Sequence, residues 1–219
     1  MCTTRNSTGR VTTPGHDTDE RRQTLEEIDA SIERVVDHAE RRFDDVRLVV
    51  FGDHGMVPVQ EVVDIEAHLD ELEPNRWADY EYFLDSNHVR FWFDTPAVAE
   101  TVRASISSLS WGSVFDTEER RRLNADVSRR YGDLIFVLSP GYLALPNFFQ
   151  RDYAVAGMHG YHPDTPANHT RLLVDDRGQG FSFRNPDLLD LVDVFPTLTD
   201  VIGLPTPNTN QGTSIIEEP

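Results

Sequence analysis

Residues 48–55, LVVFGDHG, decide the fold: four apolar residues in a row lead directly into a polar turn that is flanked by glycines. A continuous apolar run of this length predicts a strand that is buried on both faces. In open α/β sheets, ligands bind beyond the carboxyl ends of the strands, which is where Asp53 and His54 stand. The segment therefore predicts an α/β sheet with a polar site at the end of one strand.

Helical patterns on both sides of this strand complete the prediction. Asp17 is a candidate N-cap with Glu20 at the third helical position, and apolar residues then recur at helical spacing over residues 25–43. A second helical pattern covers residues 190–202 and stops at Gly203, a residue type that suits a helix C-terminus. Helices around a buried strand predict a doubly wound sheet with helices on both faces.

Composition divides the chain into a tail, a core and an insertion. Residues 1–16 are rich in Thr, Gly and Arg and are predicted to be a loop or tail. Residues 17–59 and 146–219 carry the helix and strand patterns of the α/β core. Residues 60–145 combine a predicted hairpin with further helices and strands, and we expect them to form a smaller inserted, cap-like α+β lobe.

The charge of the chain restricts its partners. All 20 basic residues are Arg, and against 38 acidic residues the formal net charge is −18. A field of this sign repels nucleic acids and anionic membranes, so we expect neither as a partner. Many acidic residues without Lys are typical of a halophilic protein in a high-salt environment, where charges are screened over about 3 Å at 1 M salt. An ordinary acidic protein from a GC-rich genome is the alternative.

The sequence carries no targeting or disulfide signal that we can identify. No apolar run approaches the ~18 residues of a membrane span, and residues 1–22 contain no apolar signal stretch. We therefore expect a cytoplasmic protein. Cys2 is the single cysteine, which excludes a disulfide framework and a cysteine-based metal site within the chain.

Two groups of residues are candidates for chemistry. Asp53 and His54 follow the predicted strand, and His159 stands between Gly157 and Gly160. Carboxylates and imidazoles are ligands that Zn²⁺ takes where Cys is absent. Spacing alone leaves two interpretations open, metal binding and an ordinary structural role in hydrogen bonding.

Three ordered segments resemble one protein family. Residues 51–56, FGDHGM, resemble the "SDHGM" segment of the alkaline phosphatase superfamily, in its nucleotide pyrophosphatase/phosphodiesterase (type I phosphodiesterase) branch; Gly52 replaces the usual Ser or Thr. Residues 157–163, GMHGYHP, look like the "GxHGY-x-P" segment of that branch. Residues 193–198 and 203–205 are similar to its closing "D-x-x-P-T-L…G-L-P" pattern. The resemblance implies the C-terminal portion of an alkaline-phosphatase-like sheet.

The resemblance also implies a site for two divalent metal ions, most often Zn²⁺. By motif, Asp53 and His54 are ligands of the ion that activates the nucleophile, and His159 is a ligand of the second ion. His16 follows a glycine, as in the family's "D-x-x-G-H" segment, and is a further candidate ligand of the second ion. Thr12 stands where that segment has its Asp.

The implied function is phosphoric-ester hydrolysis of a small-molecule substrate, with Tyr161 and His162 as candidate pocket residues. The Ser or Thr nucleophile and an earlier Asp ligand of the family precede its "DHG" segment, and we find no matching nucleophile in this chain. We therefore expect the isolated chain to be inactive, with the missing residues supplied by an N-terminal half, another chain or a homo-oligomer. The alternatives are a degenerate, non-catalytic metal-binding or scaffolding remnant, and a sulfatase-type member.

Overall fold

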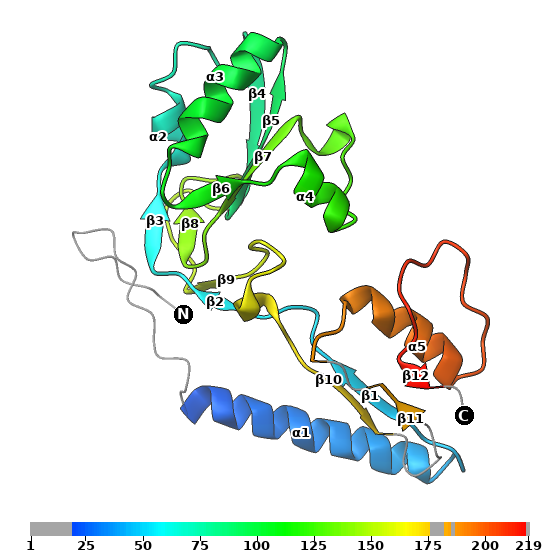
Figure 1. Ribbon diagram of the computed structural model, residues 1–219. Coiled ribbons are helices and arrows are strands. Elements are labelled where there is room, and N and C mark those ends of the chain that lie inside the picture. The colour runs from blue at the N-terminus through cyan, green and yellow to red at the C-terminus, as the bar shows by residue number, and fades with distance from the viewer. Residues whose placement is uncertain (1–18, 176–181, 185–186, 218–219) are drawn as a thin grey trace. The chain divides into compact units, whose positions relative to one another are not determined.

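The computed structural model describes residues 19–175, 182–184 and 187–217, and its fold is mixed α/β, as the sequence predicts (Figure 1). Its helices are α1 (Asp19–Glu40), α2 (Ile65–Leu69), α3 (Pro96–Ser107), α4 (Thr117–Arg122) and α5 (Val194–Val201). Its strands are β1 (Leu48–Phe51), β2 (Val57–Pro58), β3 (Glu61–Val63), β4 (Tyr80–Leu84), β5 (His88–Phe93), β6 (Gly112–Val114), β7 (Leu134–Leu138), β8 (Tyr142–Ala144), β9 (Gly157–Met158), β10 (Leu172–Asp175), β11 (Ser182–Phe183) and β12 (Ile216–Glu217).

The described residues fall into two compact units. We call residues 54–169 the central unit, and residues 19–53 with 170–217 the terminal unit. Each is described by itself below. The tail, core and lobe that we expect from composition stay a prediction.

The central unit is built on an antiparallel sheet of four strands in the order β4-β5-β7-β6. Side chains alternate along β4 and β5, so that Tyr82 and its cross-strand partner Phe91 are both buried. All five residues of β7 are buried, because this strand lies between β5 and β6. Val102 and Ile106 of α3 belong to the same core cluster. The main hydrophobic core of the unit therefore lies on this sheet.

Two short ladders extend the central unit toward the candidate site. β3 and β8 pair in parallel, and β2 and β9 pair antiparallel with Val57 opposite Met158 and Pro58 opposite Gly157. An antiparallel ladder places the chain before one strand beside the chain after the other. The β2–β9 ladder therefore draws together the two glycine-flanked segments on which the sequence prediction depends.

Local capping signals explain where the helices of this unit begin. The Thr95 side chain accepts a hydrogen bond from the Val98 amide at the start of α3, and Pro96 occupies the first helical position. At α4, Asp116 accepts from the Glu119 amide in the same way. This helix ends at Arg122, because the chain leaves the helical conformation at Leu123 and the next residue has a φ of +53°.

The terminal unit has a different construction, and it corrects one sequence prediction. β1 forms where predicted, but it pairs only with β10 among the described strands, in antiparallel register. Three of its residues are half-buried and Phe51 is exposed, so the expectation of a strand buried on both faces is wrong. A two-stranded ladder leaves too few neighbours to cover an apolar strand.

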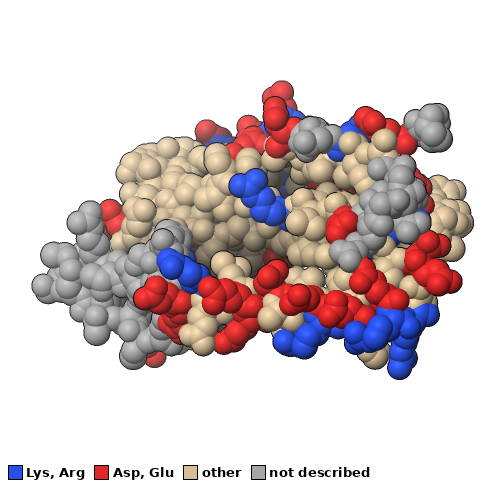
Figure 2. Space-filling view, turned by 90° about the horizontal axis from the view of Figure 1, so that it is seen from below, with Lys and Arg blue, Asp and Glu red and all other residues tan. Residues whose placement is uncertain are grey.

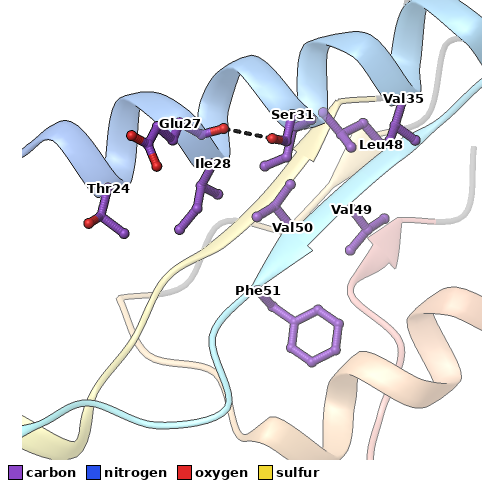
Figure 3. A pocket seen from close by; sticks show the side chains of 10 residues that line it. Thr24, Glu27, Ile28, Ser31, Val35, Leu48, Val49, Val50 and Phe51 are labelled. Atoms are coloured by element: carbon purple, nitrogen blue, oxygen red, sulfur yellow. Dashed lines mark hydrogen bonds between the residues drawn. The ribbon is translucent and has the colours of Figure 1, made fainter. Parts of the chain in front are cut away.

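Helix α1 also leaves its apolar stripe open. None of its 22 residues is buried, and Val35 is 68% exposed. A groove of about 670 Å³ lies between α1 and β1, lined by α1 residues from Thr24 to Val35 and by all of β1 (Figure 3). Val50 points toward the helix and Phe51 points away from it. Helices α1 and α5 of the terminal unit therefore differ: α1 borders an open apolar groove, whereas α5 buries five of its eight residues.

Charge on the surface follows the composition. Figure 2 shows one face of the molecule, on which acidic side chains form a long band with Arg side chains grouped beside part of it. Over the described ranges, no helix has the length and apolar character needed to cross a bilayer.

Candidate metal centre

The imidazole rings of His54 and His159 stack on each other. Their centroids are 3.7 Å apart and their planes differ by 11°. The β2–β9 ladder explains this closeness, because His54 lies three residues before Val57 and His159 directly follows Met158. The structure therefore brings together two candidate ligands that are separated by more than 100 residues of sequence.

The hydrogen bonding of His54 indicates which ring nitrogen carries the lone pair. Its Nδ1 lies 2.8 Å from the carbonyl oxygen of Gly55. A carbonyl oxygen can only accept, so Nδ1 carries the hydrogen, and in the neutral ring the lone pair is then on Nε2. A backbone carbonyl that fixes the tautomer in this way is the usual arrangement for a histidine that binds a metal.

Glycines beside these residues allow close approach of the chain before β10. A side chain at Gly55 would meet the carbonyl oxygen of Ala167 at 1.9 Å, and one at Gly52 would meet the Thr170 hydroxyl at 2.0 Å. The Gly55 amide also donates to the Asn168 carbonyl at 2.7 Å. Glycine at these two positions is therefore a packing requirement.

The other predicted metal ligands are placed less completely. Asp53 is exposed and is the last residue of its segment in the terminal unit, whereas His54 and His159 belong to the central unit. Its convergence with them therefore stays a prediction. His16 and Thr12 lie outside the described residues.

Tyr161 belongs to the hydrophobic core. It is 3% exposed, and its hydroxyl donates to the Tyr142 carbonyl at 2.8 Å. Burial raises the pKa of Tyr161 to about 12, with a backbone hydrogen bond at Gly141 acting in the opposite direction. This position favours a structural role over the pocket role that the sequence suggested.

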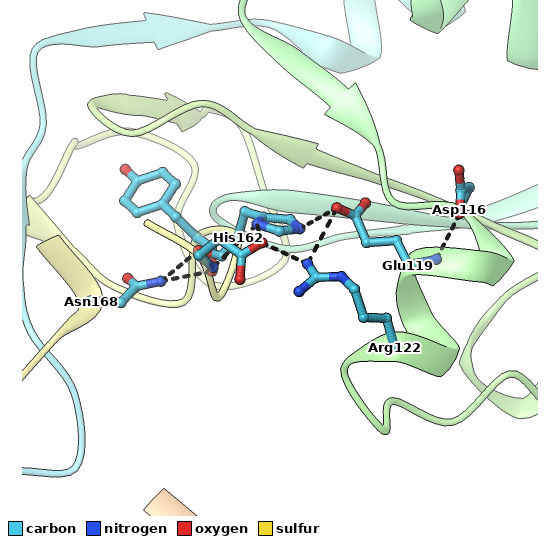
Figure 4. A network of polar contacts seen from close by, with 7 residues as sticks. Asp116, Glu119, Arg122, His162 and Asn168 are labelled. Atoms are coloured by element: carbon cyan, nitrogen blue, oxygen red, sulfur yellow. Dashed lines mark hydrogen bonds and ion pairs between the residues drawn. The ribbon is translucent and has the colours of Figure 1, made fainter. Parts of the chain in front are cut away.

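His162 lies in a polar network that sequence reasoning missed (Figure 4). Its Nε2 is 2.9 Å from a Glu119 carboxylate oxygen, and its ring meets Phe115 edge-on at 5.5 Å. Arg122 bonds Asp164 at 2.6 Å and lies 3.8 Å from Glu119. The network therefore joins α4 to the loop that carries His159.

Three residues of this network could in principle hold a cation. Glu119, His162 and Asp164 are the group that, within the described part of the chain, offers three ligand atoms within 4.8 Å of one another. Arg122 already pairs with both carboxylates, so the group fits an ion-pair cluster better than a metal site. The acidic and basic residues of α4 were visible in the sequence, but their pairing with residues more than 40 positions away was not.

Comparisons with known proteins identify a family and a fold. The sequence profile of the family "Type I phosphodiesterase / nucleotide pyrophosphatase" matches residues 7–162. No curated protein sequence matches the chain significantly.

The structure is similar to those of human and murine ectonucleotide pyrophosphatase/phosphodiesterase 5. The human protein has a TM-score of 0.71 at 17% identity over 96% of this chain and 56% of its own. The murine protein has a TM-score of 0.69 at 20% identity, over 93% of this chain and 54% of its own. An inactive variant of the murine protein, in complex with AMP, has a TM-score of 0.67 at 19% identity, again over 93% of this chain and 54% of its own. At these identities the likeness is one of fold, and the chain spans a little over half the length of these proteins.

Proposed function

The chain belongs to the type I phosphodiesterase / nucleotide pyrophosphatase family, and we propose that it contributes Asp53, His54 and His159 to the two-metal site of a phosphoric-ester hydrolase. The stacked His54–His159 pair is the observation that carries this proposal. The family supports a phosphate ester as the substrate, and the acidic composition favours a small ester over a nucleic acid polymer.

The chemistry of the donor set fits divalent cations. His54 presents Nε2 as its lone-pair nitrogen, His159 adds a second imidazole, and Asp53 adds a carboxylate. In the proposal, Asp53 and His54 hold one ion, and His159, with His16, holds the other. Zn²⁺ is the ion that best suits imidazole and carboxylate ligands without cysteine. Two such ions would supply Lewis-acid stabilisation of the attacking and leaving oxygens of a phosphoryl transfer.

Four candidate donors are too few for two zinc ions, each of which takes about four ligands. We propose that the remaining ligands and the Ser or Thr nucleophile come from a segment or chain that covers the groove between α1 and β1. The apolar lining of that groove and the pairing of β1 with β10 alone among the described strands support this idea, because both suit an added apolar strand. The greater length of the structurally similar proteins is in line with it.

Zinc titration of the purified chain tests the metal site directly. Isothermal titration calorimetry of the wild type should show zinc binding that His54→Ala and His159→Ala each weaken by at least about tenfold, since each removes one donor. His38→Ala, which removes an exposed histidine of α1, is the matched control and should leave binding unchanged. Equal binding by all four proteins would refute the assignment.

Hydrolysis assays separate the competing functions. With Zn²⁺, the isolated chain should not turn over bis(p-nitrophenyl) phosphate, and a covering segment that contains the nucleophile should restore turnover. Turnover of p-nitrophenyl sulfate instead would favour a sulfatase-type member. Zinc binding without turnover under any complementation would favour the non-catalytic remnant.

A further inference from the structure

A buried asparagine holds the backbone of His159. Asn87 lies in the turn between β4 and β5 and is 3% exposed. Its Nδ2 donates a hydrogen bond of 2.6 Å to the carbonyl oxygen of His159, 72 residues further along the chain. The Asn87 carbonyl accepts from the Leu138 amide at 2.8 Å, which ties the turn to β7. The His159 loop is therefore attached to the most deeply buried part of the central unit.

The orientation of the Asn87 amide is fixed by two further residues. Arg90 Nε lies 3.1 Å from His88 Nε2, and because a guanidinium can only donate, Nε2 accepts. His88 Nδ1 therefore carries the hydrogen, and it faces Asn87 Oδ1 at 3.1 Å. This leaves Nδ2, the donor side of the amide, directed at His159. Every donor and acceptor in the series from Arg90 to His159 is matched.

The loop that carries His159 is also adapted to its hydrogen bond with Asn87. Gly160 has a φ of +82°, a conformation that glycine adopts without strain. A side chain at Gly160 would lie 3.3 Å from Asn87 Nδ2, closer than an ordinary contact. Glycine at this position lets the carbonyl of His159 reach the buried amide.

We propose that Asn87, oriented by His88 and Arg90, is a positioning residue that holds His159 in register with His54. Through the backbone, Asn87 sets where the His159 imidazole stands, without touching a substrate or an ion itself. This inference rests on the proposed metal site for its function, but the stacked geometry on which it acts can be measured without metal.

Proton NMR of the metal-free chain tests the proposal. Stacking at 3.7 Å should shift the ring protons of His54 and His159 upfield from those of an unstacked histidine. Asn87→Ala and the nearly isosteric Asn87→Asp both remove the donor to His159 and should lose that shift. Asn147→Ala is the control, because Asn147 is also a buried asparagine, and its amide donates to the Ala144 carbonyl instead of to His159.

Zinc affinity gives the second measurement on the same variants. Loss of a group that orients a ligand weakens metal binding by about 10–100-fold, so both Asn87 variants should bind zinc at least about tenfold more weakly than the Asn147 control. Circular dichroism spectra show which variants are folded, and only folded variants are compared. Unchanged ring shifts and zinc affinity in both Asn87 variants would overturn the proposal.

The two proposals fail in different ways. If the wild type binds no zinc while its ring shifts depend on Asn87, the positioning role stands and the metal site is wrong. If zinc binds through His54 and His159 but neither measurement responds to Asn87, the metal site stands and the positioning role is wrong.

Discussion

The strands β7 and β1 have similar sequences and opposite surroundings. β7 reads LIFVL and β1 reads LVVF. β7 lies between β5 and β6, and all its residues are buried, whereas β1 pairs only with β10 among the described strands and has no buried residue. An apolar run therefore predicts that a strand forms, while the number of neighbouring elements decides whether that strand is buried.

The same contrast separates the roles that we propose for the two units. The central unit has its own packed core, and that core carries the turn and the ladder that hold His54 and His159. The terminal unit presents an apolar groove with exposed apolar lining residues such as Ile28 and Val35. A rigid frame suits the positioning of ligands, and an open apolar face suits the docking of another segment.

Truncation of one phenylalanine in each strand should give the largest difference. Phe136 of β7 is fully buried, so Phe136→Ala should lower the free energy of unfolding by about 3–5 kcal/mol through lost burial and a new cavity. Phe51 of β1 is 46% exposed, and Phe51→Ala should cost no more than about 1–2 kcal/mol. Urea unfolding followed by far-ultraviolet circular dichroism, which reports on the helices and strands of both units, measures both. Equal losses would show that β1 is as well packed as β7.

Much of the fold could be predicted because its signals are local. The hairpin predicted within residues 60–145 depends on neighbouring residues, and it is confirmed as β4 and β5. The burial of β1 could not be predicted from its own composition, because burial depends on strands elsewhere in the chain.

The candidate site follows the same division between local and distant signals. Spacing and motif pointed to His54 and His159, which the structure stacks together. Asn87 gave no signal, since its hydrogen bond spans 72 residues and an isolated asparagine in a turn is usually exposed. Tyr161 stands in a glycine-flanked motif but is buried, because its side chain belongs to the hydrophobic core and its hydroxyl donates to the carbonyl of Tyr142 in β8.

Charges placed in the groove should change how the chain associates. Ile28 and Val35 line the groove and are 50% and 68% exposed. At low salt we expect the wild type to self-associate through this face, and the double substitution Ile28→Glu with Val35→Glu to give a monomer, because exposed apolar faces drive association. Light scattering after size-exclusion chromatography measures the mass.

The control for this experiment is His38→Glu. It adds an acidic residue to α1 at a position that does not line the groove, and it should leave the association unchanged. A wild type that is monomeric at low salt would contradict the contrast between the units, since the groove would then need no cover.

Acid should weaken the central unit through His88. Burial lowers the pKa of His88, with Arg90 acting in the same direction and Asp85 opposing them. Below the usual histidine pKa of about 6.5, the unfolded chain then binds more protons than the folded one, so stability rises with pH in this range. The contribution of His88 to the stability is fully present above about pH 6.5, and it is lost as the pH falls from there through the lowered pKa.

A comparison of two proteins isolates this contribution from that of the carboxylates. The free energy of unfolding is measured at about pH 7.5 and about pH 5.5 for the wild type and for His88→Gln. The wild type should lose more stability on acidification, by about 1 kcal/mol or less. An equal pH dependence in the two proteins would mean that His88 titrates as it does in the unfolded chain.

The ion pairs between α4 and the His159 loop should have the smallest effect on stability, although they join elements of the well-packed unit. The Arg122 and Asp164 side chains are 52% and 59% exposed, and exposed ion pairs are screened by water and salt. Arg122→Ala should therefore lower the free energy of unfolding by about 0.5 kcal/mol or less, as measured by urea unfolding at low salt. Arg122→Lys keeps the charge but loses the planar pair of donors, so its free energy of unfolding should lie between those of the wild type and Arg122→Ala. A loss above about 2 kcal/mol would require a desolvated pair, and the packed region of the central unit would then extend to α4.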